Sequence, residues 1–585
     1  MASRSNTEFE IKAIRSPKSR YDVAILGGGL AGLTLALQLK RERPETSILL
    51  AEKRAEPAPD AAFKVGESTV ESGAYYLREK AGMADHLESE HLFKRGLRYF
   101  WPAGDNSDIA RRLEYVTTDF APTHQIDRGR FENACFDRAV KLGVDAFRGF
   151  RVLDVEIREG EADHAVELER EGGGTITVTA RWVVDATGRR NLLRRKLGLE
   201  TETGHDINAA WIRMANEVDV ESWSDDEEWL GRESERGVRK MATVHLIGQG
   251  YWVWLIPLAG GAHSVGICAD PRFHPFERIN EFEHLLDWFK EHEPQLGAVI
   301  DARRDEVMDF LVVEHFSYGS ERMVSPDRWS LVGEACAFLD AFYSPGSDYI
   351  GYTNNFTCDL VKRDLDGEDI GERLEFYNFL FERLFTPTTS VYKDQYQFFG
   401  NPQVMLGKVL YDTTTYFSTL PFLFIHGAMT DLDVLAGVID PLQGLMIPLL
   451  ERMQAFFREW HQIDQRSFEG ISILTRRFQP MGDRQRNLYE EFEGEAFDER
   501  LAANMELLRA TATWLFFQAA KHLPDPPDPT RAINPLAISL DPARWEEEGL
   551  FTPDGMTLAQ ALELLPGVEE FDLSTHFAPA PQGVA

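Results

Sequence analysis

The sequence predicts a mixed α/β fold, in which a helix-covered parallel sheet is interleaved with an antiparallel-sheet domain and followed by an α-helical region. A strand, a glycine turn, a helix and a second strand fill residues 21–52. Short apolar runs return at 182–185 and 329–332, and helical periodicity dominates from about residue 374. Short continuous apolar runs are typical of strands buried in a parallel sheet. Their wide separation predicts that the chain leaves this sheet and later rejoins it.

The first element carries a glycine motif. The apolar run 23–26 precedes G-x-G-x-x-G, the helix 33–40 follows it, and the strand 48–51 ends on Glu52. This order is typical of a Rossmann-type dinucleotide site, in which the glycines permit a tight turn, a close pyrophosphate and close helix–strand packing. The acid accepts from ribose hydroxyls. The pattern predicts cofactor contacts from Gly27, Gly29, Leu30, Ala31, Gly32, Glu52 and Lys53. The motif alone does not distinguish FAD from NAD.

Two later segments add candidate cofactor contacts. Gly66, Glu67 and Ser68 form a turn that enters a helix predicted over 69–80, where backbone N–H groups can meet a polar ligand edge. A loop without a ligand fits the local pattern equally well. Arg128 lies in a second turn, at 125–132, which leads into a helix running to Lys141.

Two buried strands end in short motifs of small or acidic residues. The strand 182–185 closes on Asp185-Ala-Thr-Gly188, after a small meander of strands at 152–157, 165–168 and 176–178. Small residues there let a cofactor pass close to the backbone. The strand 329–332 is followed by Gly333, Glu334 and a Gly/Ser turn containing Gly346. We expect both strand ends to contact the same cofactor.

The antiparallel domain contains a strand with three large side chains on one face. Trp252, Trp254 and Ile256 alternate, Pro257 ends the strand, and 264–268 is its predicted hairpin partner. The pattern alone favours core packing over a flat-ligand pocket. Another alternating strand, 97–101, follows Lys94, which the local pattern favours as a solvated side chain.

Composition excludes several classes of protein. The chain has 585 residues, 43% hydrophobic and 27% charged, and a net charge of −34, which disfavours nucleic acid or an anionic membrane as partner. Its four scattered cysteines predict neither a metal site nor a disulfide framework and suit a reducing cytoplasm. The first 20 residues have no apolar core, so no secretory signal is expected. No transmembrane span is expected in the apolar stretch 417–424, which Pro421 interrupts.

Together, four separated motifs resemble those of the flavin-dependent halogenase family, within the flavoprotein-monooxygenase fold. They are G-G-G-L-A-G at 27–32, D-A-T-G at 185–188, W-V-W-L-I-P at 252–257 and G-E-A at 333–335. The tryptophan motif is the one associated with halogenases. The resemblance covers about residues 20–370 and is closer to the phenol- and polyketide-modifying members than to the tryptophan-modifying ones.

The resemblance implies a reaction and roles for three side chains. In that family reduced FAD from a separate reductase, with O2, converts chloride or bromide into hypohalous acid, which reaches a lysine beside an aromatic substrate. Lys94, Gly96, Tyr99 and Trp101 follow the family's K-x-G-x-x-F-x-W segment, with tyrosine in place of phenylalanine. By this match Lys94 is the catalytic lysine, and Trp252 and Trp254 separate the substrate from the flavin.

One segment departs from the family pattern. The family holds halide on the backbone N–H groups of a Ser-Thr-Gly or Ser-Ser-Gly turn, and the corresponding run here is Tyr343-Ser344-Pro345-Gly346-Ser347. Proline has no N–H, so one expected donor is absent. Ser344, Gly346 and Ser347 are the remaining halide-binding candidates, and weakened halide binding would move the chain towards other flavin chemistry.

The strand and helix patterns along the chain predict domain boundaries. The expected domains are a flexible arm at 1–19, an FAD-binding domain at 20–205 and 320–370, a substrate-side antiparallel-sheet domain at 206–319, and a helical C-terminal region at 371–585 that covers the substrate pocket or forms a homodimer. The leading hypothesis is a cytoplasmic halogenase of secondary metabolism, such as antibiotic biosynthesis, acting on a phenolic or polyketide-like aromatic, free or bound to a carrier protein. The alternatives are an FAD monooxygenase that hydroxylates or epoxidises, and a non-catalytic flavin-binding scaffold.

Overall fold

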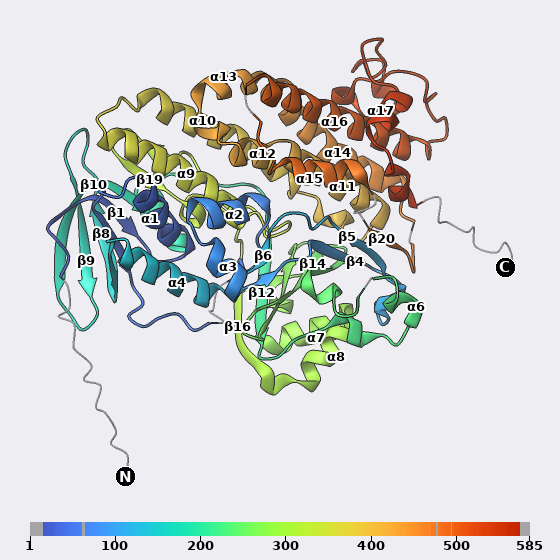
Figure 1. Ribbon diagram of the computed structural model, residues 1–585. Helices are drawn as coiled ribbons and strands as arrows, with labels where there is room; N and C mark the ends of the chain where they lie inside the picture. The colour runs from blue at the N-terminus through green and yellow to red at the C-terminus, as the bar shows by residue number, and fades with distance from the viewer. Residues whose placement is uncertain are drawn as a thin grey trace.

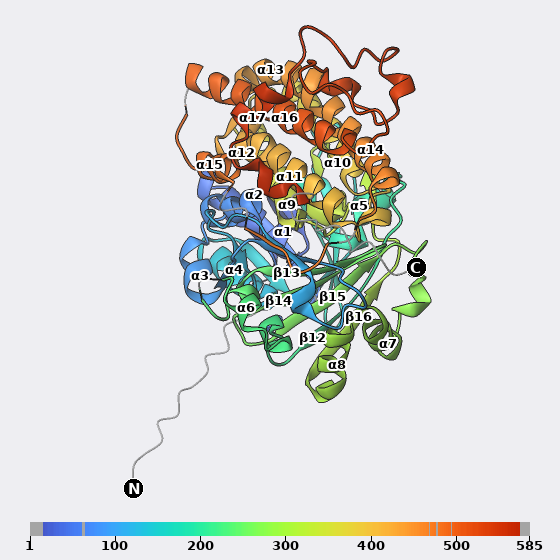
Figure 2. The ribbon, with the colours of Figure 1, turned by 90° about the vertical axis from the view of Figure 1, so that its right-hand side faces the viewer.

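The computed structural model describes residues 16–60, 65–233, 235–466, 468–474, 478–492 and 494–573. Most of the arm expected at 1–19 and the Pro-rich end from 579 lie outside these residues. Two eight-stranded sheets lie side by side, and the C-terminal helices pack across both of them (Figures 1 and 2).

The first sheet contains the expected parallel strands of the Rossmann-type unit. Its order is β18-β19-β10-β1-β2-β7, with β8 and β9 beside β10. The strands are β1 Arg20–Leu26, β2 Ile48–Glu52, β7 Asp145–Arg148, β8 Phe150–Glu156, β9 His164–Arg170, β10 Thr175–Asp185, β18 Val324–Ser325 and β19 Trp329–Leu331. Strands β19, β10, β1, β2 and β7 are parallel to their neighbours in this order. The two strands predicted at 176–178 and 182–185 form one continuous strand, β10.

Helices pack on the first sheet, beginning with the helix that the glycine turn predicts. Helix α1 Leu30–Glu42 follows β1, α2 Glu71–Tyr75 continues into the π-helical turn η1 Tyr76–Lys80, and α4 Arg128–Lys141 precedes β7. The long helix α9 Gly346–Leu365 packs on α1, where Asn354 Nδ2 donates to the Ala31 carbonyl at 3.0 Å. The middle of α9 therefore lies against the start of α1.

The second sheet is mostly antiparallel, in the order β16-β12-β15-β14-β13-β4-β5-β20. Its strands are β4 Leu97–Trp101, β5 Leu113–Val116, β12 Asn208–Met214, β13 Thr243–Gly248, β14 Tyr251–Pro257, β15 His263–Ala269, β16 Val307–Val313 and β20 Ser472–Leu474. Strands β4 and β5 fall inside the range 20–205 that the sequence assigned to the FAD-binding domain. However, β4 pairs with β13 and β5 pairs with β4, so the chain crosses to the second sheet within that range and then returns.

The second sheet separates two apolar cores. On β14, Trp252, Trp254 and Ile256 face the large core shared with the first sheet, and Val253 and Leu255 face a second core covered by α7 Phe282–His292 and α8 Pro294–Ala302. Strands β14 and β15 pair antiparallel, as expected for a hairpin. The predicted alternation is confirmed.

Helices dominate the described part of the C-terminal region, with a strand as the exception that joins the second sheet. Its main helices are α10 Gly371–Thr388, α11 Pro402–Ser418, α12 Leu420–Ile425, α13 Leu432–Pro441, α14 Ile447–Ile463, α15 Gln479–Asn487, α16 Glu495–Ala520 and α17 Leu558–Leu564. The exception is β20, which pairs in parallel with β5 at the edge of the second sheet. A strand edge left open exposes unpaired N–H and C=O groups, and β20 satisfies those of β5.

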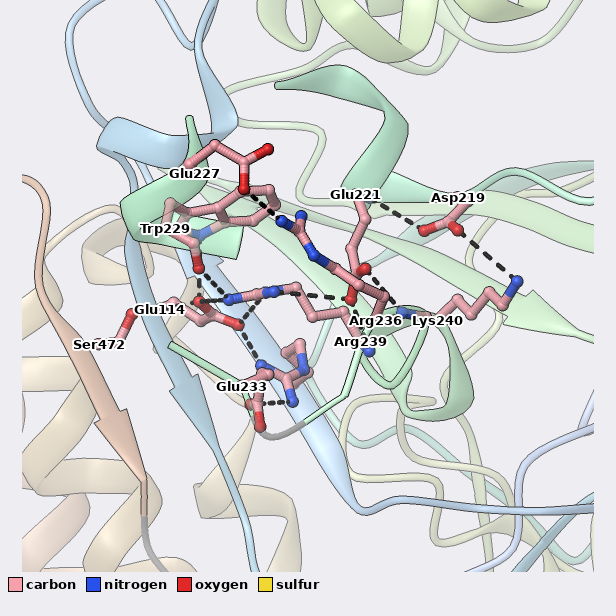
Figure 3. Close-up of polar contacts among 12 residues, drawn as sticks. Glu114, Asp219, Glu221, Glu227, Trp229, Glu233, Arg236, Arg239, Lys240 and Ser472 are labelled. Atoms are coloured by element: carbon pink, nitrogen blue, oxygen red, sulfur yellow. Dashed lines mark hydrogen bonds and ion pairs between the residues drawn. The ribbon is translucent and has the colours of Figure 1, made fainter. Parts of the chain in front are cut away.

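A buried cluster of charged side chains stabilises this edge of the second sheet (Figure 3). Glu114 of β5 accepts from Arg98 of β4, from Arg239 Nε at 2.9 Å and from Ser472 Oγ of β20 at 3.2 Å. Burial alone would raise the pKa of Glu114, but the two guanidinium groups lower it. The cluster therefore joins β4 and β5 to the C-terminal region.

One helical run also meets the length and composition of a membrane-spanning segment. The run Leu432–Ile463 joins α13 and α14 through a π-helical turn and has a mean hydropathy of 1.4 over its most apolar window, 28% of which is buried. Core helices of soluble proteins also meet this criterion. The expectation of no membrane partner stays a prediction.

Candidate active site

The larger cavity lies at the carboxyl ends of β1, β2 and β10, and we call it the glycine-loop cavity. Its volume is about 590 Å³. Ligands of open α/β sheets bind at this end of the strands. The sequence-predicted residues that line it are Gly27, Gly29, Leu30, Ala31, Glu52, Lys53, Gly66, Glu67, Ser68, Arg128, Gly188, Trp252, Trp254, Glu334, Ser344, Gly346 and Ser347.

The glycine turn is sterically fixed. Gly27 has φ +116°, and a Cβ there would lie 2.4 Å from the Ala186 carbonyl oxygen. A Cβ on Gly32 would lie 2.1 Å from the Gly27 carbonyl oxygen, so this glycine serves the predicted helix–strand packing. Gly29 is the N-cap of α1, which leaves the first N–H groups of the helix facing the cavity end of β1. A helix N-terminus without competing side chains fits a pyrophosphate.

Glu52 also shapes the turn it was predicted to serve. Its carboxylate accepts from the Gly28 N–H and the Arg54 N–H, both at 2.9 Å. Each carboxylate oxygen has a further lone pair, so the side chain remains able to accept from a ribose hydroxyl. The Glu52 carboxylate therefore holds the turn in place and at the same time faces the cavity.

The turn at 66–68 is held by helix α4 and by two strands of the second sheet. Arg128 Nη1 donates to the Val65 carbonyl at 2.7 Å. Glu67 accepts from Arg213 of β12 at 2.8 Å, and burial raises the pKa of Glu67 against the opposing effect of Arg213. Ser68 Oγ lies 2.8 Å from Thr243 Oγ1 of β13. The alternative of a loop without a role is disfavoured, because this turn forms a wall of the cavity.

Three predicted cofactor residues do not line the cavity. Asp185 is fully buried and accepts from the N–H groups of Thr187 and Leu193, at 2.9 and 2.7 Å. Gly333 has φ +54° and packs its Cα side against Ile350. Together with Gly32 they shape the turns around the cavity. These positions support the walls of the cavity, and direct contact of the three residues with a cofactor stays a prediction.

A second, smaller cavity of about 150 Å³ contains Lys94, and we call it the lysine cavity. Lys94 is 1% exposed, and its Nζ donates to the Thr69 carbonyl at 2.6 Å. This corrects the solvated lysine that the local pattern favours. The cavity walls come from the β4 and β5 ends, the start of α9, and the C-terminal helices α10, α11, α12 and α14.

The lysine cavity combines aromatic walls with three titratable groups near one another. Burial lowers the pKa of Lys94 to about 8, partly offset by the carboxyl groups of Glu71 and Asp348. Burial likewise raises the pKa of Asp348 to about 7, although Tyr416 and the Gly73 N–H donate to it. An amine that changes protonation near neutral pH is suited to proton or electrophile transfer.

The tryptophan pair lies on the cavity-facing side of β14. Trp252 Nε1 donates to Tyr396 Oη at 2.8 Å, and Trp254 Nε1 donates to Ser264 Oγ at 3.1 Å. Both indoles are at most 5% exposed and line the glycine-loop cavity. The two side chains thus pack in the core and also line the cavity, and a ligand-facing role stays a prediction.

The predicted halide segment separates the two cavities. Tyr343 and Pro345 line the lysine cavity, and Ser344, Gly346 and Ser347 line the glycine-loop cavity. Pro345 is the N-cap of α9, so the Gly346 and Ser347 N–H groups precede its first intrahelical bonds. Ser347 Oγ is buried and has no hydrogen-bond partner among the described residues. Because Pro345 has no N–H, the segment keeps two backbone donors, those of Gly346 and Ser347, on the side facing the glycine loop.

Sequence reasoning missed most of the lysine cavity. Glu71, Asp348, Tyr392, Asp412 and Tyr416 line it, and four of these lie in helices where they read as ordinary polar or aromatic positions. Arg189 and Arg190, next to the D-A-T-G motif, line the glycine-loop cavity and were also missed. Their position at a strand end was the available signal.

Comparisons with known proteins agree with this geometry. The model of the FAD binding domain family matches residues 20–264. Flavin-dependent halogenase chlA of Dictyostelium discoideum is 26% identical over 442 residues, which cover 69% of this chain and 70% of that protein. A chlorinase of 1H-pyrrole-2-carbonyl peptidyl-carrier protein from Pseudomonas fluorescens is 26% identical over 339 residues, covering 56% of this chain and 72% of its own.

Solved structures share the fold. Halogenase PltM in complex with phloroglucinol and FAD matches with a TM-score of 0.54 at 16% identity, covering 86% of this chain and 97% of that one. The chondrochloren halogenase CndH, from a myxobacterium, matches with a TM-score of 0.51 at 19% identity, covering 65% and 84%. At these identities the likeness is one of fold.

Proposed function

From the premise that this chain is an FAD-dependent enzyme of the flavin-dependent halogenase family, we propose that it places chloride or bromide on an electron-rich aromatic ring held beside Lys94. The observation that carries the proposal is the pair of cavities separated by one loop, with a buried amine in the smaller one. The substrate we propose is a phenolic or polyketide-like aromatic. The relative named as a carrier-protein chlorinase and the phloroglucinol complex of PltM support small aromatics in free or carrier-bound form.

The residues of the glycine-loop cavity fit FAD. The α1 N-terminus, where Gly27 and Gly29 line the cavity, would hold the pyrophosphate, and Glu52 would hold a ribose. Reduced FAD, with O2 and halide, would supply the electrophilic halogen as hypohalous acid. The N–H groups of Gly346 and Ser347 would hold the halide. We keep Ser344 as a third candidate because its side chain faces the same cavity.

Lys94 would hold the electrophile beside the ring. Its ammonium can donate to the oxygen of hypohalous acid, and its amine can accept the halogen. Because the pKa of Lys94 is about 8, both forms are accessible near neutral pH. Trp252 and Trp254 would keep the substrate away from the flavin, and the tyrosine-lined walls of the lysine cavity would exclude water. A cavity of about this size lined by apolar groups accommodates a single benzene-sized ring.

An FAD monooxygenase is the second candidate, and Pro345 is the observation that favours it. One of the usual halide donors is missing at this position. Weak halide binding would leave oxygen transfer as the outcome of the same flavin chemistry.

Mass spectrometry of a turnover mixture distinguishes these functions. The mixture contains the protein, FAD, a flavin reductase with NADH, air, bromide or chloride, and a panel of phenols, indoles and polyketide-like aromatics. We expect a phenolic product in which halogen replaces hydrogen. A product that gains only oxygen, unchanged when halide is omitted, would establish the monooxygenase instead. Rapid reoxidation of the reduced flavin with no peroxide-like intermediate would favour the scaffold hypothesis, whereas a lack of product alone would mainly call for a wider substrate panel.

Several partner assignments remain proposals from the sequence. We propose a separate flavin reductase as the source of reduced FAD, a role in secondary metabolism such as antibiotic biosynthesis, and a cytoplasmic location. We propose neither nucleic acid nor membrane as a partner, because the net charge is −34. We also propose a homodimer, which light scattering would test.

A further inference from the structure

The loop between the two cavities has two faces that alternate along the chain. Tyr343, Pro345 and Asp348 face the lysine cavity, and Ser344 and Gly346 face the glycine-loop cavity. The wall is therefore one residue thick. Any movement of one face must move the other.

The backbone of this loop is strained. Tyr343 has φ +71° and Ser344 has φ +61°, so two consecutive non-glycine residues lie in the left-handed region. Such conformations cost free energy and persist only where surrounding contacts hold them. The contacts that hold this loop should therefore be identifiable.

One such contact comes from helix α11. Tyr343 Oη donates to Asp412 Oδ2 at 2.9 Å. Asp412 is in turn held by Lys408 Nζ at 2.7 Å and by Gln454 Nε2 at 2.8 Å, and both of these side chains are fully buried. A hydrogen bond to a buried and oriented carboxylate is stronger than one between neutral groups. Asp412 is thus a rigid acceptor for the Tyr343 phenol.

The same helix face holds the other end of the loop. Tyr416 lies four residues after Asp412 on α11, and its Oη donates to Asp348 Oδ2 at 2.6 Å. Residues four apart on a helix share a face. The Gly73 N–H donates to the other oxygen of Asp348 at 2.7 Å, which ties this end of the loop to α2. One face of α11 therefore holds both ends of the segment 343–348.

We propose that α11 positions the halide-facing side of this loop, with Asp412 as a positioning residue that acts through Tyr343 on Ser344, Gly346 and Ser347. The inference rests on the proposed function and assigns a task to the C-terminal helices beyond covering the substrate. It predicts that halide affinity at the glycine-loop cavity depends on a hydrogen bond made in the lysine cavity.

The test is Tyr343→Phe, which removes one hydroxyl and leaves Asp412 paired with Lys408 and Gln454. Chloride is titrated into the purified protein loaded with oxidised FAD, and the halide dissociation constant is read from the change in flavin absorbance. FAD affinity is measured separately by fluorescence. We expect the chloride dissociation constant to rise about 10-fold, as for loss of one charge-assisted hydrogen bond, with FAD affinity unchanged. A merely structural role for Tyr343 would weaken both together.

Tyr352→Phe is the matched control. Tyr352 also lines the lysine cavity, but its Oη pairs with Ser72 Oγ at 2.7 Å and not with α11. We expect its chloride affinity to equal that of the wild type. Equal chloride affinities in Tyr343→Phe and wild type, or equal losses in both variants, would overturn the inference and leave the proposed function standing. No chloride response in wild-type protein would overturn the proposed halide site itself, and the inference with it.

Asp412→Asn gives a second reading of the same contact. The amide keeps an acceptor for Tyr343 but loses the charge, so we expect a smaller increase in the chloride dissociation constant than in Tyr343→Phe. An increase larger than that of Tyr343→Phe, with FAD affinity retained, would contradict the assigned path through Tyr343.

Discussion

The two cavities lie on opposite sides of one loop, yet they are built from different parts of the chain. The glycine-loop cavity is made largely of backbone at the ends of β1, β2 and β10, and short motifs mark it. The lysine cavity is made of side chains from at least five separate segments. A site built from backbone needs particular residues at fixed spacing, whereas a site built from side chains needs only a suitable set brought together by the fold. The first kind is visible in a sequence and the second is largely hidden.

The largest expected difference between the two cavities comes from replacing one lysine in each of them. Lys94→Met removes the lysine that lines the lysine cavity, and we expect halogenation to fall on the order of 1,000-fold with FAD binding intact. Lys53→Met, in the glycine-loop cavity, should instead weaken FAD binding and leave the rate per bound FAD unchanged. Product by mass spectrometry and bound flavin by absorbance check both. Loss of FAD from Lys94→Met would mean that the two cavities are not independent.

Removing the buried acid at the sheet edge should affect stability rather than either cavity directly. Glu114→Gln leaves Arg98 and Arg239 without their shared partner, and breaking a buried pair costs about 3–5 kcal/mol. Urea denaturation measures this change. Glu469→Gln, which removes an exposed partner of Arg111 between the same two segments, is the control and should leave the midpoint unchanged. Similar midpoints for the two variants would show that the cluster does not hold the edge.

A methyl group in the glycine turn should affect only the backbone-built cavity. Gly27→Ala places a Cβ 2.4 Å from the Ala186 carbonyl oxygen at φ +116°, so we expect FAD affinity to fall roughly 10- to 100-fold. Gly143→Ala has a similar left-handed φ of +86° with open space around its Cβ, and should retain FAD. Fluorescence titration of FAD distinguishes them. Full FAD affinity in Gly27→Ala would contradict the assignment of the turn.

The smallest expected effect is a shift in the pH dependence of halogenation, which follows the protonation of Lys94. In wild-type protein the halogenation step should follow a group with a pKa of about 8, with activity lost above that pH if the ammonium acts and gained if the amine acts. Asp348 has a pKa of about 7, so it is charged at pH 8 and raises the pKa of Lys94. Asp348→Asn should therefore move the profile to lower pH by less than about one unit. A shift to higher pH, or none, would place the titration elsewhere.

The sequence predicts the backbone parts of this molecule well. The first sheet and its cavity can be predicted from Gly27, Gly29 and Glu52, because a local geometry requires each of these residues. The alternation of Trp252 and Trp254 predicts which face of β14 points inward. Asp185 shows the limit of a motif, since it holds its own turn rather than facing the cavity.

The remainder depends on long-range packing. Asp412 and Tyr416 occupy unremarkable helical positions, and nothing nearby in the sequence indicates that they meet Tyr343 and Asp348. The early crossing of β4 and β5 to the second sheet is decided by pairing with β13, more than 100 residues later, as Val244 opposite Arg98 illustrates. Propensity and periodicity report local structure and carry no information on such partners.

The pairing of β20 with β5 bears on how the protein is made. Ser472 and Glu114, which join these strands, are 358 residues apart in the chain. At ribosomal rates of roughly 5–20 residues per second, the β5 edge waits about 20–70 s for its neighbour to be synthesised. During that time an unpaired strand edge is open to other nascent chains. Slower translation should therefore increase aggregation of this protein during expression, and shortening the chain before residue 472 should leave that edge permanently uncovered.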